Sequence, residues 1–256
     1  MSDAILGNPA GSDRSFFRAC ITAMAGIIVL GFVVNLAMGR SSFNAPLILH
    51  LHAAVFMGWI GIVLAQVWLA TEGNIAMHRR LGRLAVLWAV AMLVLGTWVT
   101  VASTQTGRTP FFFQPQHFLI ANPLSLLGFA GLLGAAIALR RQTDWHSRLQ
   151  IGAFVLLMGP GFGRLLPMPF LTPFAWETAV LVALIVPAIG MLRDWRVHGR
   201  PHPAWFWCIG VVVGITLLAR VIGFSPVGEA VYASVTAGTV VAGTDGLVFP
   251  PPPGPL

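Results

Sequence analysis

The sequence predicts an all-α integral membrane protein, a bundle of seven transmembrane helices, and three observations support this. Hydrophobic residues make up 57% of the 256 residues and charged residues only 9%, whereas charged residues form roughly 25% of a soluble globular chain. Seven apolar stretches reach the length of about 20 residues that a helix needs to cross a bilayer. The 15 basic residues are all arginine, and most of them lie in alternate gaps between these stretches.

The predicted spans fill residues 19–224, between a polar N-terminal tail over residues 1–18 and a tail rich in small residues and proline over residues 225–256. The fifth span is the weakest, because Pro160 and its flanking glycines interrupt it and proline lacks the backbone donor of a helix interior. We expect the C-terminal tail to pack loosely at the membrane interface and then to be disordered. The spans are Ala19–Met38, Pro46–Ala70, Leu84–Ser103, Phe118–Leu139, Leu149–Leu166, Phe174–Leu192 and Ala204–Gly223.

The arginines also predict the orientation of the bundle. Eleven lie on the side of the N-terminal tail and four on the opposite side. Because cytoplasmic loops carry the excess of positive charge, we expect the N-terminus in the cytoplasm and, after seven spans, the C-terminus outside. The eleven are Arg14, Arg18, Arg79, Arg80, Arg83, Arg140, Arg141, Arg148, Arg193, Arg196 and Arg200; the four are Arg40, Arg108, Arg164 and Arg220.

The net charge of +7 indicates the lipid bilayer as the partner and not nucleic acid, because the arginines bracket apolar segments and form no stripe on a polar face. Cys20 and Cys208 lie inside apolar stretches and support neither a disulfide framework nor a thiolate metal site. The eight acidic residues lie in tails, in loops or at span ends. Ion-coupled carriers commonly place a carboxylate at the bilayer midplane, so coupled transport is disfavoured, whereas a small-molecule channel is not.

Histidine is the residue type with metal-ligand chemistry in this chain, and an outer group consists of His50, His52 and His117. His50 and His52 lie near the outer end of span two, and residues two apart on a helix point about 200° apart, so they cannot share a metal. His117 begins span four at the same outer level. His52 and His117, or His50 and His117, can therefore ligate one haem iron from two helices. The alternative is that these histidines bond a neighbouring helix or anchor the chain at the interface.

An inner pair, His78 and His146, lies at matching levels and offers a second bis-histidine site. Spans two–three and four–five form similar hairpins, each with an outer histidine and an inner His-x-Arg-Leu turn; we favour a shared solution to membrane insertion over a duplication. His52 and His78 are 26 residues apart, which at about 1.5 Å per residue is about 39 Å, more than the ~30 Å hydrocarbon core. We therefore expect the inner pair among the head groups, and favour helix capping and phosphate binding over haem ligation there.

No catalytic motif is present: the chain has no Walker loop, no nucleophile elbow and no His-Glu-x-x-His zinc motif. We expect no enzymatic activity. Glu177 and Arg164 flank the short outer loop, and we expect them to pair across it as a structural clasp.

Four segments carry a resemblance: the run from His52 to Trp59, the His78-Arg-Arg-Leu-Gly turn, the His146-Ser-Arg-Leu turn and His202-Pro. They resemble a broad group of uncharacterised bacterial multi-pass membrane proteins over roughly residues 45–225. This resemblance implies a bacterial membrane protein and no particular activity. A remoter likeness, through histidines on successive helices, is to b-type di-haem membrane cytochromes and implies haem and electron transport; their ligand pairs lie inside the helices, as His78 and His146 do not.

From these observations we expect a multi-pass protein of the bacterial inner membrane that binds haem b through His52 and His117 as its metal ligands. Such a protein carries electrons or serves as a redox-partner subunit for other membrane proteins. The rival class is a non-enzymatic structural, assembly or lipid-binding protein whose histidines lie at the interface, and a small-molecule channel is the third class.

Overall fold

The computed structural model describes residues 9–41 and 43–252, and every regular element in these residues is helical. The elements, in chain order, are α1 (Pro9–Ala37), α2 (Leu47–Thr71), α3 (Ile75–Gln105), α4 (Pro115–Ala138), α5 (Thr143–Leu156), α6 (Gly159–Leu165), the 3-10 helix η1 (Met168–Leu171), α7 (Ala175–Leu181), the 3-10 helix η2 (Val182–Leu184), α8 (Ile185–His198), α9 (Pro203–Gly223) and α10 (Pro226–Thr236).

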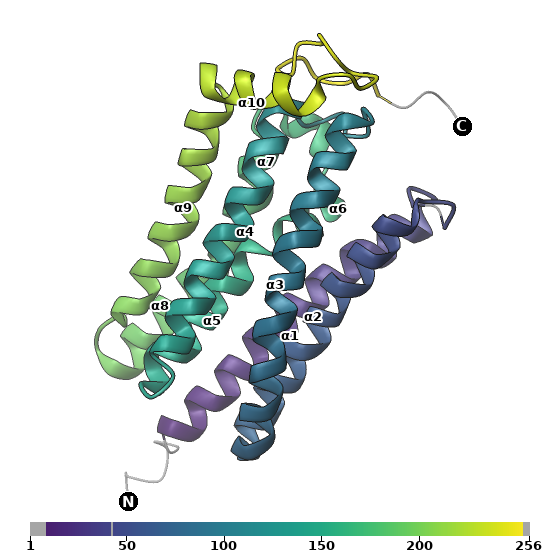
Figure 1. Cartoon of the computed structure of the whole chain (residues 1–256). Coiled ribbons are helices and arrows are strands. Elements are labelled where there is room, and N and C mark those ends of the chain that lie inside the picture. The colour runs from purple at the N-terminus through teal and green to yellow at the C-terminus, as the bar shows by residue number, and fades with distance from the viewer. Residues whose placement is uncertain (1–8, 42, 253–256) are drawn as a thin grey trace, which may run out of the picture.

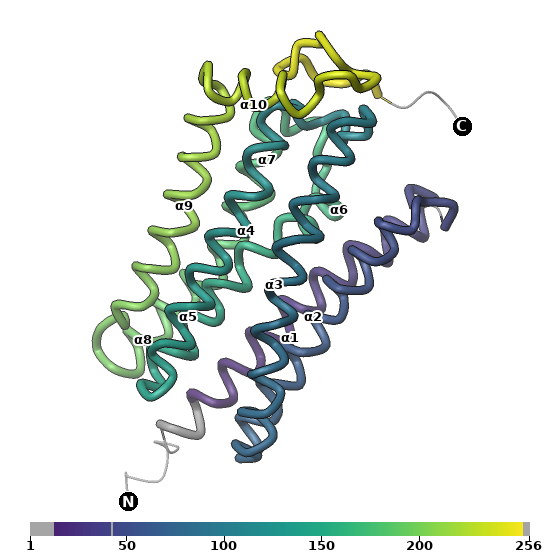
Figure 2. The backbone as a smooth tube through the Cα atoms, viewed as in Figure 1, coloured from purple at the N-terminus to yellow at the C-terminus, as the bar shows by residue number. Residues whose placement is uncertain are grey.

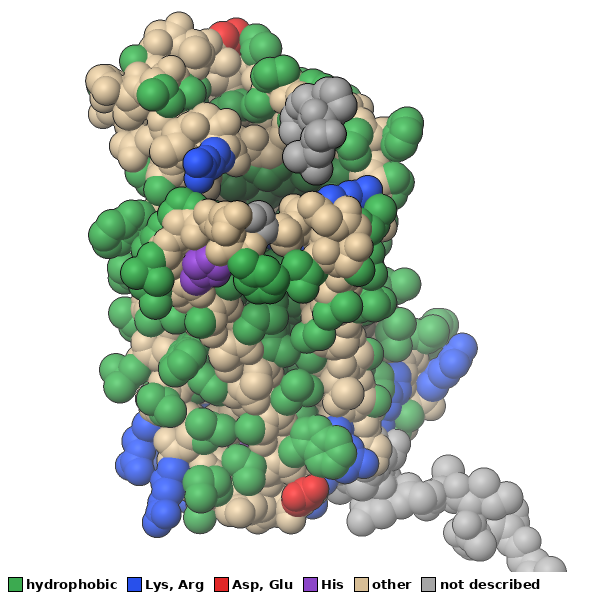
Figure 3. Space-filling model, turned by 90° about the vertical axis from the view of Figure 1, so that its right-hand side faces the viewer, with side chains coloured by type: hydrophobic (Ala, Val, Ile, Leu, Met, Phe, Trp, Pro, Cys, Tyr) green, Lys and Arg blue, Asp and Glu red, His purple; other side chains and the backbone are tan. Residues whose placement is uncertain are grey.

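Six helical runs in the described residues are long and apolar enough to cross a membrane. The described residues are thus all-helical, as expected, and their long apolar helices are consistent with a multi-pass membrane protein. Hydrophobic side chains also cover much of the middle of the face that Figure 3 shows. The six runs are Asp13–Ala37, Leu47–Thr71, Ile75–Gln105, Pro115–Ala138, Ala175–His198 and Pro203–Gly223.

The predicted fifth span, Leu149–Leu166, is broken and not one continuous helix. α5 ends at Leu156, α6 begins at Gly159, and Pro160 lies in the first turn of α6. Proline is suited to that place because the first turn does not need its missing donor. The predicted interruption is confirmed, so the described residues contain six long apolar helical runs and, between the fourth and the fifth, this broken segment.

The bundle has two distinct ends (Figure 1). The start of α1 and the α2–α3, α4–α5 and α8–α9 connections lie at one end, which we call the arginine-rich end because the eleven arginines named above lie there. The C-terminal segment with α10 lies over the other ends of α3, α4 and α9, and we call this end of the bundle the α10 end. The chain trace in Figure 2 runs through α5 and α6 from the first end toward the second, so the broken segment connects the same two ends as the long helices.

The two predicted tails are more ordered than expected. α1 begins at Pro9, inside the region 1–18 that was predicted to be a polar tail. In the region 225–256, α10 is followed by turns that are bonded to the bundle at Gly246 and Leu247, while residues 253–256 lie outside the described part. The Gln105 and Gln114 side-chain amides donate to the carbonyls of Val235 and Leu247 at 3.0 and 2.7 Å. Because these amides satisfy backbone groups of the segment, its small and apolar residues form a cap on the α10 end.

The hydrophobic core lies where α1, α4, α5 and α9 meet. Phe129 and Phe154 are fully buried there together with Met24 and Val212. At the α10 end of the core, Gly31 of α1 meets the backbone of α6, and a Cβ at that position would lie 2.5 Å from the Gly161 carbonyl oxygen. The broken segment is thus packed against α1 backbone to backbone.

Candidate functional site

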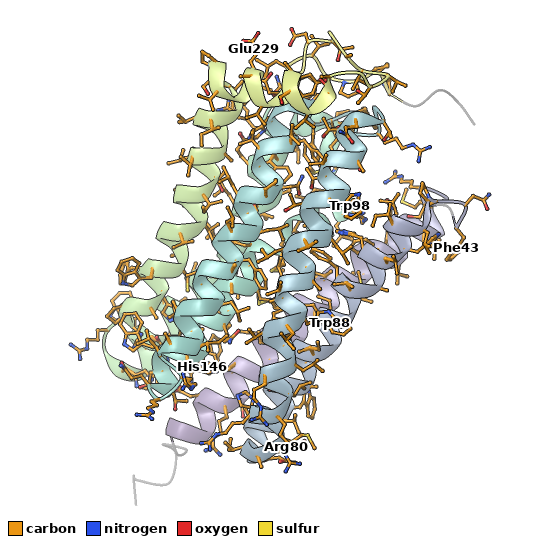
Figure 4. All side chains as sticks on the ribbon, viewed as in Figure 1. Phe43, Arg80, Trp88, Trp98, His146 and Glu229 are labelled. Atoms are coloured by element: carbon orange, nitrogen blue, oxygen red, sulfur yellow. The ribbon has the colours of Figure 1, made fainter. Side chains whose placement is uncertain are left out.

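The structure brings together His78 and His146, the inner histidine pair of the sequence. Each is the fourth residue of its helix, α3 or α5, directly after a hairpin connection. Their ring centroids lie 6.2 Å apart, with the ring planes at 85°. Figure 4 shows His146 toward the arginine-rich end of the bundle, with Arg80 at the tip of that end. Two imidazoles from separate hairpins therefore share one small region.

Both rings are held by the same kind of hydrogen bond. His78 Nδ1 lies 3.2 Å from the Gln66 carbonyl oxygen, and His146 Nδ1 lies 2.8 Å from the Ala136 carbonyl oxygen. A carbonyl oxygen only accepts, so Nδ1 carries the proton in each ring and Nε2 of the neutral ring keeps its lone pair. His78 of α3 is thus bonded to the end of α2, and His146 of α5 is bonded to the end of α4.

The surroundings of His146 favour its neutral form. Burial lowers the pKa of His146, the hydrogen bond to the Ala136 carbonyl acts in the opposite direction, and the neighbouring His78 lowers the pKa further. A neutral imidazole with a free Nε2 is the form that ligates metals. An Nδ1–H bond to a backbone carbonyl is also the usual way in which a metal-binding histidine is oriented.

The pair has the spacing of two imidazoles on opposite sides of one metal. With metal–nitrogen bonds of about 2 Å on each side, ring centres come to lie about 6 Å apart, close to the 6.2 Å between His78 and His146. No group of three or more histidine, cysteine or carboxylate side chains able to hold a metal occurs in the described residues. A structural zinc site, which needs four ligands, does not fit this pair, whereas two histidines are a ligand set with which proteins hold a haem iron.

The outer pair His52 and His117 is not assembled in the same way. The His52 ring packs on Phe56, with centroids 4.2 Å apart, and His117 packs on Trp176 and Phe224. Within the described part of the chain the two histidine rings have no ring contact with one another. The outer haem site therefore stays a prediction.

His117 and His50 have different structural settings. His117 is 4% exposed and lies directly against α9, since a Cβ on Gly223 would come within 2.9 Å of the His117 ring. His50 is exposed, and its Nε2 lies 3.1 Å from the Phe43 carbonyl oxygen, to which it donates. One outer histidine is thus a helix-packing residue and the other closes a surface turn.

Glu177 pairs with Arg220 and not with Arg164, which corrects the ion pair expected from the sequence. The Arg220 guanidinium lies 2.6 Å from Glu177 Oε1 and also stacks over Phe174 and Phe224. The reason is packing: α7 lies against α9, so Arg220 reaches Glu177 from its last turn. Arg164, in turn, has no ion pair with any carboxylate of the described residues.

The most buried charged side chains of the described residues form an ion pair that was not predicted from the sequence. Arg148 of α5 and Asp194 of α8 are 2% and 1% exposed, and the guanidinium donates from both Nε and a terminal nitrogen to the carboxylate, at 2.8 and 2.7 Å. Trp205 Nε1 of α9 donates to the same carboxylate at 2.8 Å. Their separation of 46 residues leaves no local signal in one sequence. The sequence indicated only that both residues lie at the arginine-rich ends of predicted spans.

A cavity of about 380 Å³ lies beside this ion pair at the arginine-rich end. The Asp194 carboxylate accepts hydrogen bonds from Arg148, from Trp205 and from the His202 backbone N–H. The ion pair therefore joins α5, α8 and α9, and its carboxylate has few lone pairs left for a ligand. The cavity is lined by Asp13, Asp144, Trp145, Arg148, Asp194, His198, Arg200, Pro201, His202 and Pro203.

No protein-family model matches this chain, and neither a curated protein nor a solved structure matches it. The function therefore has to be argued from the side chains described above, among which the His78–His146 pair has the most specific geometry.

Proposed function

We propose that this chain is a seven-pass protein of the bacterial inner membrane that binds haem b between His78 and His146 and carries electrons. The observation that supports the haem site is the pair itself: two imidazoles whose ring centroids lie 6.2 Å apart, each with Nδ1 bonded to a backbone carbonyl oxygen. This pair replaces His52 and His117 as the first candidate for the ligands.

The membrane arrangement is proposed from the charges and the broken segment. Six long apolar helices and the α5–α6 segment, which links the two ends of the bundle, make seven passes. Eleven arginines lie at the end where α1 begins, and the positive-inside rule assigns that end to the cytoplasm.

The residues of the chain have defined tasks in this proposal. His78 and His146 would hold the haem iron through Nε2, while the carbonyls of Gln66 and Ala136 hold the rings and would make these nitrogens more basic. Bound haem would supply one-electron exchange, with a potential that depends on its protein ligands and on burial. The histidines lie at the start of α3 and α5, so the cofactor would lie toward the arginine-rich end.

A second candidate function is supported by the same hydrogen bonds. Each Nδ1–H···O=C bond ties the first turn of one helix to the last turns of the preceding helix. In a non-enzymatic structural or assembly protein, the only role of His78 and His146 would be to hold the helices of these two hairpins together through these hydrogen bonds. The two functions differ in whether Nε2 is needed.

Asparagine separates the two functions, because its amide N–H takes the place of Nδ1–H and it has no counterpart of Nε2. We expect detergent-purified protein from a haem-replete host to have a Soret band that shifts on dithionite reduction. His78→Asn and His146→Asn should each lose the haem spectrum and keep the helical circular dichroism of the parent. His198→Asn, a change at an exposed histidine that belongs to no candidate ligand pair, is the matched control and should keep the spectrum.

Three outcomes contradict parts of the proposal. A colourless parent protein overturns the haem site and leaves the structural function. A spectrum retained in both inner asparagine variants overturns the assignment of the ligands. Loss of the spectrum in His52→Asn and His117→Asn instead would restore the outer pair that the sequence favours.

A further inference from the structure

Arg164 is an embedded cation without an acidic partner in the described residues. Its guanidinium lies 3.9 Å from the ring centroid of Phe32, which is five residues before the last residue of α1. At about 1.5 Å per residue, Phe32 lies about 7–8 Å inside the end of an apolar helix. Charged side chains at such depth are costly and are commonly paired or functional.

The guanidinium has unused hydrogen-bonding capacity. One terminal nitrogen donates to the Pro160 carbonyl at 2.7 Å within α6, whereas Nε is buried and has no hydrogen-bond partner. An arginine offers five N–H donors in a planar fork. A buried donor left without an acceptor keeps its desolvation penalty uncompensated, so a ligand that supplies acceptors there would be favoured.

His52 of α2 is the second side chain of this site. Its Nδ1 is also buried without a hydrogen-bond partner, and the charge of Arg164 acts on its ring. α2 and α6 both pack against α1, so His52 and Arg164 come from two elements that flank one helix. The Arg164 guanidinium and the His52 imidazole together provide hydrogen-bond donors and a positive charge. Arg164 Nε and His52 Nδ1 have no acceptor within the protein.

The neighbouring surface is apolar and faces outward. Along α1, Val29 and Val33 lie on the side of the helix next to Phe32, and both are exposed. Figure 1 shows that α1 and α2 lean away from α3 toward the α10 end, so this part of α1 is at the periphery of the bundle. In a bilayer such a surface is covered by acyl chains.

We propose that Arg164 and His52 bind the oxyanion, a carboxylate or phosphate group, of an anionic amphiphile whose chain lies along α1. The guanidinium donates to the oxyanion through Nε and a terminal nitrogen, and His52 donates through Nδ1. Phe32 holds the guanidinium plane, and the contact of Gly31 with Gly161 fixes α6 on α1. The same chemistry fits a free anion from solution, which the test separates from a lipid.

The test measures the midpoint of thermal unfolding of the full chain in a neutral maltoside detergent. Laurate and dodecyl phosphate are titrated, with acetate and inorganic phosphate as the matched anions without a chain. We expect a saturable rise of the midpoint for the parent protein, because a ligand that binds only the folded state stabilises it. Arg164→Gln should weaken the apparent affinity at least tenfold.

Arg108→Gln is the matched control, since Arg108 is an exposed arginine near the same end of the bundle, and it should bind as the parent does. If Arg164→Gln does not fold, His52→Leu takes its place; it removes one donor and should weaken binding roughly tenfold, as loss of a hydrogen bond to a charged group does.

A rise with the two amphiphiles alone identifies a membrane lipid as the source of the oxyanion. An equal, Arg164-dependent rise with acetate or phosphate supports the site and identifies a free anion as the source. The proposal is overturned if none of the four probes gives a saturable rise of the midpoint. It is also overturned if the probes bind with equal affinity to the parent and to the variant that is tested, Arg164→Gln or its replacement His52→Leu. Neither result depends on haem, so this site and the His78–His146 site fail or succeed separately.

Discussion

Arg148 and Asp194 show how a single pair of residues constrains the end of the bundle. Burying either charge alone carries a large desolvation penalty, which a bidentate pair offsets only with good geometry and further hydrogen bonds. Both conditions are met: two nitrogen–oxygen contacts of 2.7 and 2.8 Å, and a third donor from Trp205. Because the partners come from α5, α8 and α9, the pair specifies how these three helices meet.

Removal of one partner should therefore be more costly than removal of both. We expect Arg148→Met to lower the free energy of unfolding by about 3–5 kcal/mol, since it leaves Asp194 charged, buried and under-paired. The double variant Arg148→Met with Asp194→Leu should recover most of this loss. Chemical unfolding in detergent, followed by circular dichroism, measures the difference. Arg141→Met, at an exposed position, serves as the control; an equal effect of Arg148→Met and Arg141→Met would show that the pair contributes nothing to stability.

At the scale of elements, the broken segment depends on its contact with α1. Gly31 lies against the Gly161 carbonyl, where an added Cβ would be only 2.5 Å from oxygen, and backbone atoms cannot move aside as a flexible side chain can. Gly26, five residues earlier on the same helix, has open space at its Cβ. The two glycines therefore form a matched pair for testing the contact.

Gly31→Ala should destabilise the protein by about 1–3 kcal/mol, as overpacking does, although alanine is the better helix former. Gly26→Ala should be neutral or stabilising by up to about 1 kcal/mol, because it gains helix propensity without a clash. Thermal unfolding of both variants in the same detergent measures the contrast. If both changes have the same sign and size, α1 and α6 are not in contact in the membrane protein.

The elements also show what one sequence can and cannot predict. Apolar length predicted the six long helices, and Pro160 predicted the interruption between α5 and α6, because both signals are local. The cap formed by α10 was not predicted, since it depends on amides of Gln105 and Gln114 more than a hundred residues away. His78 and His146 were named as a pair from their spacing, but their 6.2 Å separation follows from how two hairpins pack, which no local pattern contains.

At the scale of the whole molecule, the charge asymmetry and the broken segment together determine the proposed topology. The arginine-rich end holds both inner histidines and the Arg148–Asp194 pair, while Arg164 and the Glu177–Arg220 pair lie toward the α10 end. If α5 and α6 cross the membrane, the two ends of the chain lie on opposite sides. If they fold back, both ends lie on the same side.

Reporter fusions distinguish these two arrangements. With seven passes, green fluorescent protein fused after Arg80 or Arg141 should fluoresce in the cytoplasm, and alkaline phosphatase fused after Arg108 or Pro250 should be active outside, because the phosphatase folds only under oxidising conditions. Arg108 is the control for Pro250, since it precedes the broken segment and is outside in both arrangements. A fluorescent fusion at Pro250 beside an active phosphatase at Arg108 would show that α5 and α6 do not cross. An active phosphatase at Arg80 would reverse the orientation of the whole bundle and place the His78–His146 pair at the outer face.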